Sequence, residues 1–333
     1  MKTYRLVAPS LLEPFEVAEP TELDLAKGEV LVKVRAGGIC GSDVPHFAGK
    51  RSAVLTHAGA TSVPGFPMHE VVGEVIASAS PDFTNGDLTV GWASNASALA
   101  ETIRVEATGL STYPARWDHT EAIMLQPLAC AIHVLDQIGA VDGKRFAILG
   151  QGPIGLLFSH VAKSRGAAWV TGVDRVSQPD STGTFGVDEF IHSSTDRWAH
   201  ALLNEDRPEV VIEAIGHQVG TFVDAVQAVS PHGLVYYFGI PDDIVYPLPM
   251  VAMLRKNLTL GAGTVTQPFR RPALAQAIAH LQAHPGLIDA YITDVFGFAD
   301  AQNAYMHAST PTTGQHKIVI DWGTMTADTR NIE

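Results

Sequence analysis

The sequence predicts an α/β protein of two domains, one with a doubly wound parallel sheet and one rich in β-strands. A chain of 333 residues exceeds the size at which a single hydrophobic core keeps growing. Its first third contains short alternating segments with frequent glycine and proline, which is typical of strands and turns. Near residue 125 the pattern changes to helices that alternate with unbroken apolar runs, as in a parallel sheet covered on both faces.

Two segments of the first third are predicted to be strands. Residues 29–36 (EVLVKVRA) alternate apolar and polar side chains, and so do residues 69–78 (HEVVGEVIAS). A long loop rich in glycine and proline separates them, and loops of that length inside a compact domain are usually functional.

The second part of the chain reads as a series of helices and apolar strands. Residues 128–140 have helical spacing, and residues 145–175 form a strand, a glycine turn, a helix and a second strand, which together make one βαβ unit. The remaining expected strands are 209–216, 233–240, 258–265 and 316–322, and the remaining expected helices are 222–229, 272–286 and 299–309.

Composition excludes several classes of function. The net charge of −13 argues against nucleic acid, because phosphate binding needs a basic surface. No apolar run approaches the length of a membrane span, and the amino terminus lacks the apolar core of a signal peptide. Two cysteines cannot form a disulfide framework, so we expect a cytoplasmic protein with a small-molecule partner.

The glycine turn of the βαβ unit has the pattern G-Q-G-P-I-G at residues 150–155. Gly150 permits the tight turn, Gly152 lets the backbone approach a pyrophosphate, and Gly155 lets the helix pack on the strand. The free N–H groups of the helix amino terminus then face the phosphates. Because the pattern follows an apolar strand and opens a helix, it predicts a dinucleotide-binding domain of the Rossmann type.

Asp174 indicates which dinucleotide is bound. It ends the second strand of the βαβ unit, where an acid accepts hydrogen bonds from the ribose hydroxyls and repels a 2′-phosphate. NAD is therefore favoured over NADP. Arg175 complicates this prediction, since a guanidinium can stack on adenine or attract a phosphate. The alternative interpretation is that both residues form an exposed turn.

Cys40 and His69 are candidate zinc ligands. A thiolate and an imidazole from separate loops are ligands that zinc takes in a catalytic site. Asp43 could orient the histidine, and Ser42 could carry a proton to solvent. The spacing alone leaves the alternative open that Cys40 is a buried apolar residue, the usual fate of a free cysteine.

In combination, these motifs resemble the medium-chain alcohol dehydrogenase superfamily, and most of all its polyol and threonine dehydrogenase branches. The segments that carry the resemblance are GICGSD (38–43), HEVVGEV (69–75), QPLACAIH (126–133), GQGPIG (150–155), EAIG (213–216), LRKNLTLGAG (254–263) and KIVID (317–321). The resemblance implies a GroES-like catalytic domain at 1–127 and 265–333 and a Rossmann domain at 128–264. It also implies zinc that polarises a substrate alcohol, and hydride transfer to NAD.

The resemblance assigns roles by position. Cys40 and His69 match zinc ligands, Glu70 an acid that can approach the metal, Ser42 the proton relay and Asp43 the acid behind the histidine. Cys130 lies on the helix that passes the nicotinamide, and Ala214, Ile215 and Phe238 line the nicotinamide and ribose. The cofactor-binding residues expected are Cys130, Gly150, Gly152, Pro153, Ile154, Gly155, Asp174, Arg175, Ala214, Ile215 and Phe238.

Three departures from the family pattern affect the prediction. Gln126 occupies the position of the third zinc ligand, where a neutral amide is a poor substitute for a carboxylate. Pro45 stands where many members have a relay histidine, and His46 follows one place late. The four cysteines of a structural zinc lobe are missing, so we expect one catalytic zinc and no structural zinc.

The function expected from these residues is interconversion of a secondary alcohol, of polyol, sugar or cyclitol type, and its ketone. Gln126 keeps a metal-free reductase of an activated double bond or ketone as an alternative. A non-catalytic NAD-binding sensor is the third possibility, because fold does not dictate function. By analogy with the family, we expect a homodimer or homotetramer, with residues 236–240 (YYFGI) as a possible pairing edge.

Overall fold

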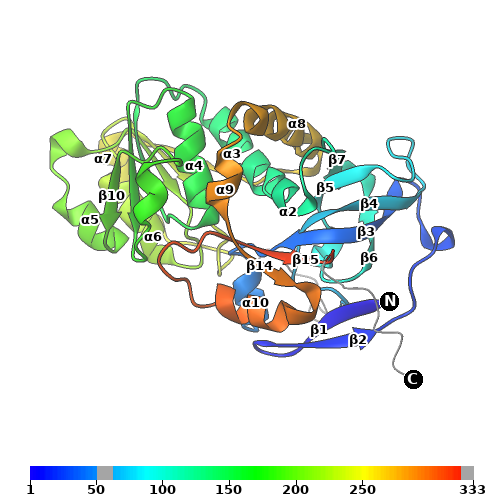
Figure 1. Cartoon of the computed structure of the whole chain (residues 1–333). Helices are drawn as coiled ribbons and strands as arrows, with labels where there is room; N and C mark the ends of the chain where they lie inside the picture. The colour runs from blue at the N-terminus through cyan, green and yellow to red at the C-terminus, as the bar shows by residue number, and fades with distance from the viewer. Residues whose placement is uncertain (51–62, 324–333) are drawn as a thin grey trace.

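The computed structural model describes residues 1–50 and 63–323, so parts of the predicted polar loop and of the range 265–333 lie outside the described residues. Two sheets dominate the described chain, and Figure 1 shows them side by side, with α3 and α8 above and between them. No described helix is long and apolar enough to span a membrane.

The first sheet is parallel and has the strand order β10-β9-β8-β11-β12-β13. Its strands are β8 (Arg145–Leu149), β9 (Trp169–Asp174), β10 (Glu189–His192), β11 (Val210–Glu213), β12 (Leu234–Tyr237) and β13 (Thr259–Ala262). The chain leaves β8 and crosses to β9 on one side, then later returns to β11 on the other. This reversal is the switch point at which doubly wound sheets bind ligands, and it confirms the predicted Rossmann fold.

Helices cover both faces of this sheet. They are α3 (Leu125–Ile138), α4 (Pro153–Ser164), α5 (Thr195–Ala201), α6 (Val219–Ala228) and α7 (Met250–Lys256). Phe146 and Ile148 of β8 belong to the same buried cluster as Phe158 of α4, whereas Ala147 and Leu149 belong to the cluster that contains Phe222 of α6. Alternate residues of one strand thus meet helices on opposite faces, which explains why residues 146–149 are all apolar.

The second sheet is mostly antiparallel and has the order β14-β15-β3-β4-β5-β7, with β6 paired to β3. Its strands are β3 (Glu29–Gly38), β4 (Glu70–Ser78), β5 (Leu88–Trp92), β6 (Thr102–Glu106), β7 (Leu110–Thr112), β14 (Ile292–Gly297) and β15 (Lys317–Asp321), and a hairpin of β1 (Lys2–Ala8) and β2 (Leu11–Glu16) lies beside it. β15 pairs with β3, so the end of the described chain reaches the strand that leads to Cys40.

The remaining helices connect or cover these sheets. They are α1 (Asp43–Phe47), α2 (His119–Ala122), α8 (Gln267–Ala283), α9 (Leu287–Tyr291) and α10 (Ala301–Ala308), with 3-10 turns η1 (Glu22–Asp24), η3 (Ser94–Ala96), η4 (Ala107–Gly109), η5 (Pro179–Thr182), η6 (Asn204–Asp206) and η7 (Phe298–Asp300). Arg271 of α8 donates hydrogen bonds to the carbonyl oxygens of Leu110 and Ala107, which attaches α8 to the second sheet.

Two details of the prediction are wrong. The segment YYFGI is no sheet edge, because β12 pairs with β11 and β13, and β13 is the outer strand. Helix α8 begins at Gln267 rather than Pro272, so that Pro272 lies inside the helix. The residue at N1 or N2 of α8 is itself a proline, Pro268, and either proline is a plausible helix start from sequence alone.

Candidate active site

The Cys40 loop follows β3 and turns directly into α1. Gly38 is needed there, because a Cβ on it would lie 2.2 Å from Oε2 of Glu70. The backbone N–H of Cys40 donates to Oδ2 of Asp43 at 2.9 Å, which holds the loop in a closed turn. Ser42 precedes α1 and is half-buried, and Asp43 is buried. The loop therefore presents the thiol of Cys40 and the hydroxyl of Ser42 from a fixed backbone.

Asp43 connects this loop to β4. Its Oδ1 lies 2.8 Å from Nδ1 of His69, and because a carboxylate only accepts, Nδ1 donates and Nε2 is left for another partner. Burial alone would lower the pKa of His69, but the charge and hydrogen bond of Asp43, with Cys40 beside the ring, raise that pKa well above its usual value. Asp43 thus fixes the orientation of the imidazole, as the acid behind a metal-ligating histidine does.

Cys40, His69 and Glu70, which we call the Cys40 cluster, bring one potential ligand atom each to within 4.8 Å of the others. Thiolate, imidazole and carboxylate are all zinc ligands. Oε2 of Glu70 is buried and has no hydrogen-bond partner among the described residues, although a cation lies near it. The donor set therefore fits a divalent cation.

That nearby cation is Lys317, the first residue of the KIVID segment, for which the sequence predicts no role. Its Nζ lies 2.5 Å from Oε2 of Glu70, and both side chains are 1% exposed. The two side chains form a buried ion pair. Nζ also donates to the carbonyl oxygen of Ile39 at 2.9 Å, so Lys317 joins β15 to the Cys40 loop. In the sequence, a lysine inside an otherwise apolar strand indicates a buried cation that needs a partner.

Gln126 and Cys130 lie one turn apart in α3, and both are buried. The amide Nε2 of Gln126 is 3.8 Å from the sulfur of Cys130 and donates to it. Burial raises the pKa of Cys130, and the charges of Cys40 and Glu70 add to this rise, which places Cys130 near the Cys40 cluster as a neutral thiol. The amide nitrogen of Gln126 therefore donates to a residue of its own helix. The three candidate ligands come instead from the Cys40 loop and from the start of β4.

Tyr291 of α9 is a neighbour that sequence reasoning missed. Its side chain is fully buried and its hydroxyl has no hydrogen-bond partner among the described residues. Burial raises the pKa of Tyr291 well above its usual value, with further rises from the charges of Glu70 and Cys40. His46, at the position after the missing relay histidine, is also buried, and burial lowers its pKa.

The glycine turn lies at the carboxyl end of β8. A Cβ on Gly155 would be 1.8 Å from the carbonyl oxygen of Gly150, so only glycine allows α4 to begin this close to the strand. Gly152 has open space where a Cβ would lie, and α4 starts at Pro153, with Ile154 half-buried behind it. This leaves a backbone surface that a phosphate can approach.

Asp174 lies at the end of β9, directly beside the turn. Its Oδ2 accepts from the backbone N–H of Gln151 at 2.6 Å, and its Oδ1 accepts from that of Val176 at 2.8 Å. Each carboxylate oxygen keeps a second lone pair for a ribose hydroxyl. Arg175 is exposed.

The segment after β11 faces the same turn. Gly150 is so close to Ile215 that a Cβ on the glycine would be 2.8 Å from that side chain, and the N–H of Ala214 donates to Leu149. Phe238 packs edge to face on Phe158 of α4 at 5.0 Å. The structure thus places Ala214 and Ile215 beside the glycine turn, and Phe238 against the helix that the turn opens.

Glu213 supports this segment and was missed by sequence reasoning. Its Oε1 accepts from the N–H groups of Ile215 and Gly216 and from the hydroxyl of Thr221 at 2.8 Å. The side chain is fully buried, and burial raises its pKa against the effect of those hydrogen bonds. In the sequence, the position of Glu213 at the end of an apolar strand is the feature that indicates a buried acid.

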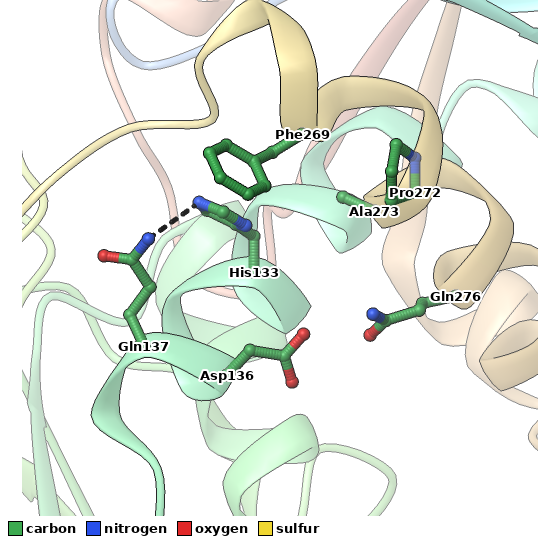
Figure 2. Close-up of a pocket in the computed structure, with 7 residues that line it drawn as sticks. All are labelled: His133, Asp136, Gln137, Phe269, Pro272, Ala273 and Gln276. Carbon is green, nitrogen blue, oxygen red and sulfur yellow. Dashed lines mark hydrogen bonds between the residues drawn. The ribbon is translucent and has the colours of Figure 1, made fainter.

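A separate pocket of about 230 Å³ opens between α3 and α8. Figure 2 shows the ring of His133 directed toward Gln137 and beside Phe269. The remaining lining residues are Asp136, Pro272, Ala273 and Gln276. None of the residues of the Cys40 cluster lines this pocket.

Comparison with known proteins gives two domain matches. The alcohol dehydrogenase GroES-like domain matches residues 26–114, and the zinc-binding dehydrogenase domain matches residues 153–283. The first match includes β3 to β7 of the second sheet, and the other includes β9 to β13 of the parallel sheet and begins at the helix that follows the glycine turn.

Several characterised proteins are similar over most of the chain. L-idonate 5-dehydrogenase (NAD(P)+) of Escherichia coli is 28% identical over 76% of this chain and 81% of its own. D-altritol 5-dehydrogenase of Agrobacterium fabrum is 27% identical over 80% and 84%. Among solved structures, an alcohol dehydrogenase from Thermus sp. ATN1 has a TM-score of 0.81 at 22% identity, with 96% of this chain and 99% of that one covered. Galactitol-1-phosphate dehydrogenase from Escherichia coli has a TM-score of 0.78 at 20% identity, with 96% and 100% covered.

Proposed function

Because this chain belongs to the zinc-type medium-chain alcohol dehydrogenase family, we propose that it oxidises a secondary alcohol of a polyol, sugar or cyclitol to the ketone with NAD. The observation that carries the proposal is the convergence of Cys40, His69 and Glu70, with Asp43 behind the histidine. The named relatives act on idonate and altritol, which supports a polyhydroxylated substrate.

Cys40 and His69 would hold zinc, with Glu70 as the third donor in place of Gln126. When bound there, zinc would act as a Lewis acid on the substrate oxygen. Asp43 keeps Nδ1 of His69 protonated, so that Nε2 presents its lone pair. The hydroxyl of Ser42, half-buried in the same loop, would take the alcohol proton toward solvent.

The glycine turn and its neighbours would hold the dinucleotide. Gly150, Gly152 and Gly155 leave the backbone open to the pyrophosphate, and Asp174 would accept from the ribose hydroxyls. Ala214, Ile215 and Phe238 would line the nicotinamide end, where NAD would accept the hydride. Since a carboxylate repels a 2′-phosphate, kcat/KM should be higher with NAD than with NADP, and an equal value would contradict this assignment.

The test compares the two cysteines. Cys40→Ser should lose the zinc of the Cys40 cluster and lower kcat by at least about 1000-fold on a panel of polyols, because Lewis-acid stabilisation is worth several kcal/mol. Cys130→Ser is the matched control for zinc content and should retain the metal. NAD binding, followed by nicotinamide fluorescence, should survive in both. Near-normal turnover of Cys40→Ser, or of metal-stripped wild type, would refute the zinc role and favour a metal-free reductase.

We also propose that the chain forms a homodimer or homotetramer through the outer strand β13 and the region around α7. Apolar side chains stand exposed there, with Ile244 at 88% and Leu254 at 77%. Exposed apolar surface next to an open sheet edge favours pairing with a second copy. Light scattering during size exclusion should give the mass of two or four chains, and a monomer at micromolar concentration would contradict it.

A further inference from the structure

Three histidines from two helices meet outside the Cys40 cluster. His160 lies in α4, His280 lies in the last turn of α8, and His284 ends that helix. One ring nitrogen of each lies within 4.8 Å of the others. His160 is buried, and His280 and His284 are half-buried. We call them the three-histidine cluster. Neither the dehydrogenase chemistry nor the cofactor site uses them.

The hydrogen bonds of His160 determine which nitrogen is available. Its Nδ1 lies 3.0 Å from the carbonyl oxygen of Thr184, and a carbonyl only accepts, so Nδ1 carries the proton. Nε2 of His160 therefore presents a lone pair, and it points at Nε2 of His280 at 3.1 Å. Metal-ligating histidines are oriented in this way, by a hydrogen bond from the other ring nitrogen to a fixed acceptor.

The spacing on α8 also suits a metal. His280 and His284 are four residues apart (HLQAH), the separation at which two helical histidines share one zinc ion. Their rings lie 4.5 Å apart, and each is nearly perpendicular to the ring of His160. Zinc–nitrogen bonds of the usual length in a tetrahedral site put two ligand nitrogens about 3.3 Å apart, close to the observed separation of His160 and His280.

We propose that His160, His280 and His284 form a second, previously unassigned site that binds Zn²⁺ through three imidazole nitrogens, with a water molecule as the fourth ligand. Imidazole is a borderline ligand that suits zinc and the neighbouring transition metals, whereas Ca²⁺ and Mg²⁺ require oxygen.

The surroundings permit a cation. The positive charge of Arg165, which acts on His280, is paired with Asp136 at 2.8 Å. Gln276, one turn before His280 on α8, and Asp136 both line the pocket of Figure 2.

A metal at this position would join two parts of the molecule. α4 carries the glycine turn at its amino terminus, while Arg271 of α8 is bonded to the β-rich sheet. An ion held by both helices would cross-link them, and binding to the folded state alone would raise thermal stability.

The experiment measures zinc stoichiometry. Chelator-treated wild type and His280→Gln/His284→Gln are dialysed against the same buffered free Zn²⁺, and bound zinc is counted by mass spectrometry. We expect one zinc fewer per chain in the double variant, whatever the Cys40 cluster holds. His200→Gln, which removes an exposed histidine of α5, is the matched control and should equal wild type.

Two further measurements keep the test decisive. Co²⁺ bound by nitrogen alone lacks the sulfur-to-metal absorption of a cysteine site, so the double variant should lose the visible bands of the histidine site while any sulfur band stays. If circular dichroism shows that the double variant is unfolded, His284→Gln replaces it, with zinc affinity at the histidine site at least tenfold weaker. Equal zinc content and an equal zinc-induced rise in melting temperature in variant and wild type would overturn the proposal.

Discussion

The Cys40 cluster and the three-histidine cluster each gather three potential metal ligands, but they are stabilised differently. The first is surrounded by charge: Asp43 pairs with His69, and Lys317 with Glu70. The second is built of imidazoles, and a backbone carbonyl orients that of His160. A charged cluster depends on each partner, because a lone buried ion is costly, whereas neutral rings can remain packed without an ion. Mutations of single partners should therefore be much more damaging in the first cluster.

The largest effect is expected at Lys317. Lys317→Met leaves the carboxylate of Glu70 buried without its cation, and breaking such a pair from one side typically costs about 3–5 kcal/mol. Chemical denaturation should show this loss in the free energy of unfolding. Restoring neutrality with Glu70→Gln in the same chain should recover part of it.

Lys163→Met is the matched control for this measurement. Lys163 pairs with Asp188 at 2.7 Å, but the two side chains are 35% and 23% exposed. A pair in contact with solvent contributes roughly 0–1 kcal/mol. If both lysine variants lose equal stability, the buried pair does not organise the Cys40 cluster as argued.

A smaller effect is expected at Asp43, which acts through His69 rather than on the substrate. Asp43→Asn removes the charge that orients the imidazole, and loss of such a partner costs about 10–100-fold in metal affinity or activity. Zinc affinity of the Cys40 cluster should fall while that of the three-histidine cluster stays constant, as competition with a chelator would measure.

Asp242→Asn provides the comparison for Asp43. Asp242 also pairs with a histidine, His217, at 2.6 Å, but neither belongs to a metal-ligand cluster. In Asp242→Asn, the zinc affinities of the Cys40 cluster and of the three-histidine cluster should match those of the wild type. An equal fall in both aspartate variants would show that the effect of Asp43 is general and not a matter of ligand orientation.

The parts predicted from sequence are those whose residues are contiguous. The glycine turn, its flanking strand and helix, and Asp174 lie within one βαβ unit, so local spacing determines their arrangement. The residues of the Cys40 cluster are predictable from their type and from the family pattern. The contact of Lys317 with the Cys40 loop is not, because Lys317 lies 278 residues from its hydrogen-bond partner Ile39.

The three-histidine cluster shows the same limit more strongly. His160 and His280 are 120 residues apart, and only the packing of α4 near the end of α8 brings their rings together. The prediction that residues 236–240 form a pairing edge is wrong for a related reason. The apolar run of β12 fits a buried central strand as well as an exposed edge strand. Periodicity tells which residues are buried, but not which element covers them.

Glu213 tests the comparison between charged and neutral groups most finely, because it is a buried acid held by hydrogen bonds and no cation among the described residues pairs with it. Burial raises its pKa, so its protonated form is favoured in the folded state. The stability that Glu213 contributes is fully present below the ordinary carboxyl pKa and is lost as pH rises through the raised value.

Glu213→Gln removes this pH dependence. Unfolding free energies measured from about pH 4 to 8 should show the wild type losing stability relative to the variant as pH rises. Glu189→Gln, at an exposed acid of the same sheet, should run parallel to wild type. A Glu213→Gln curve that also runs parallel would mean that the hydrogen bonds to Oε1 fully compensate the burial of the charge.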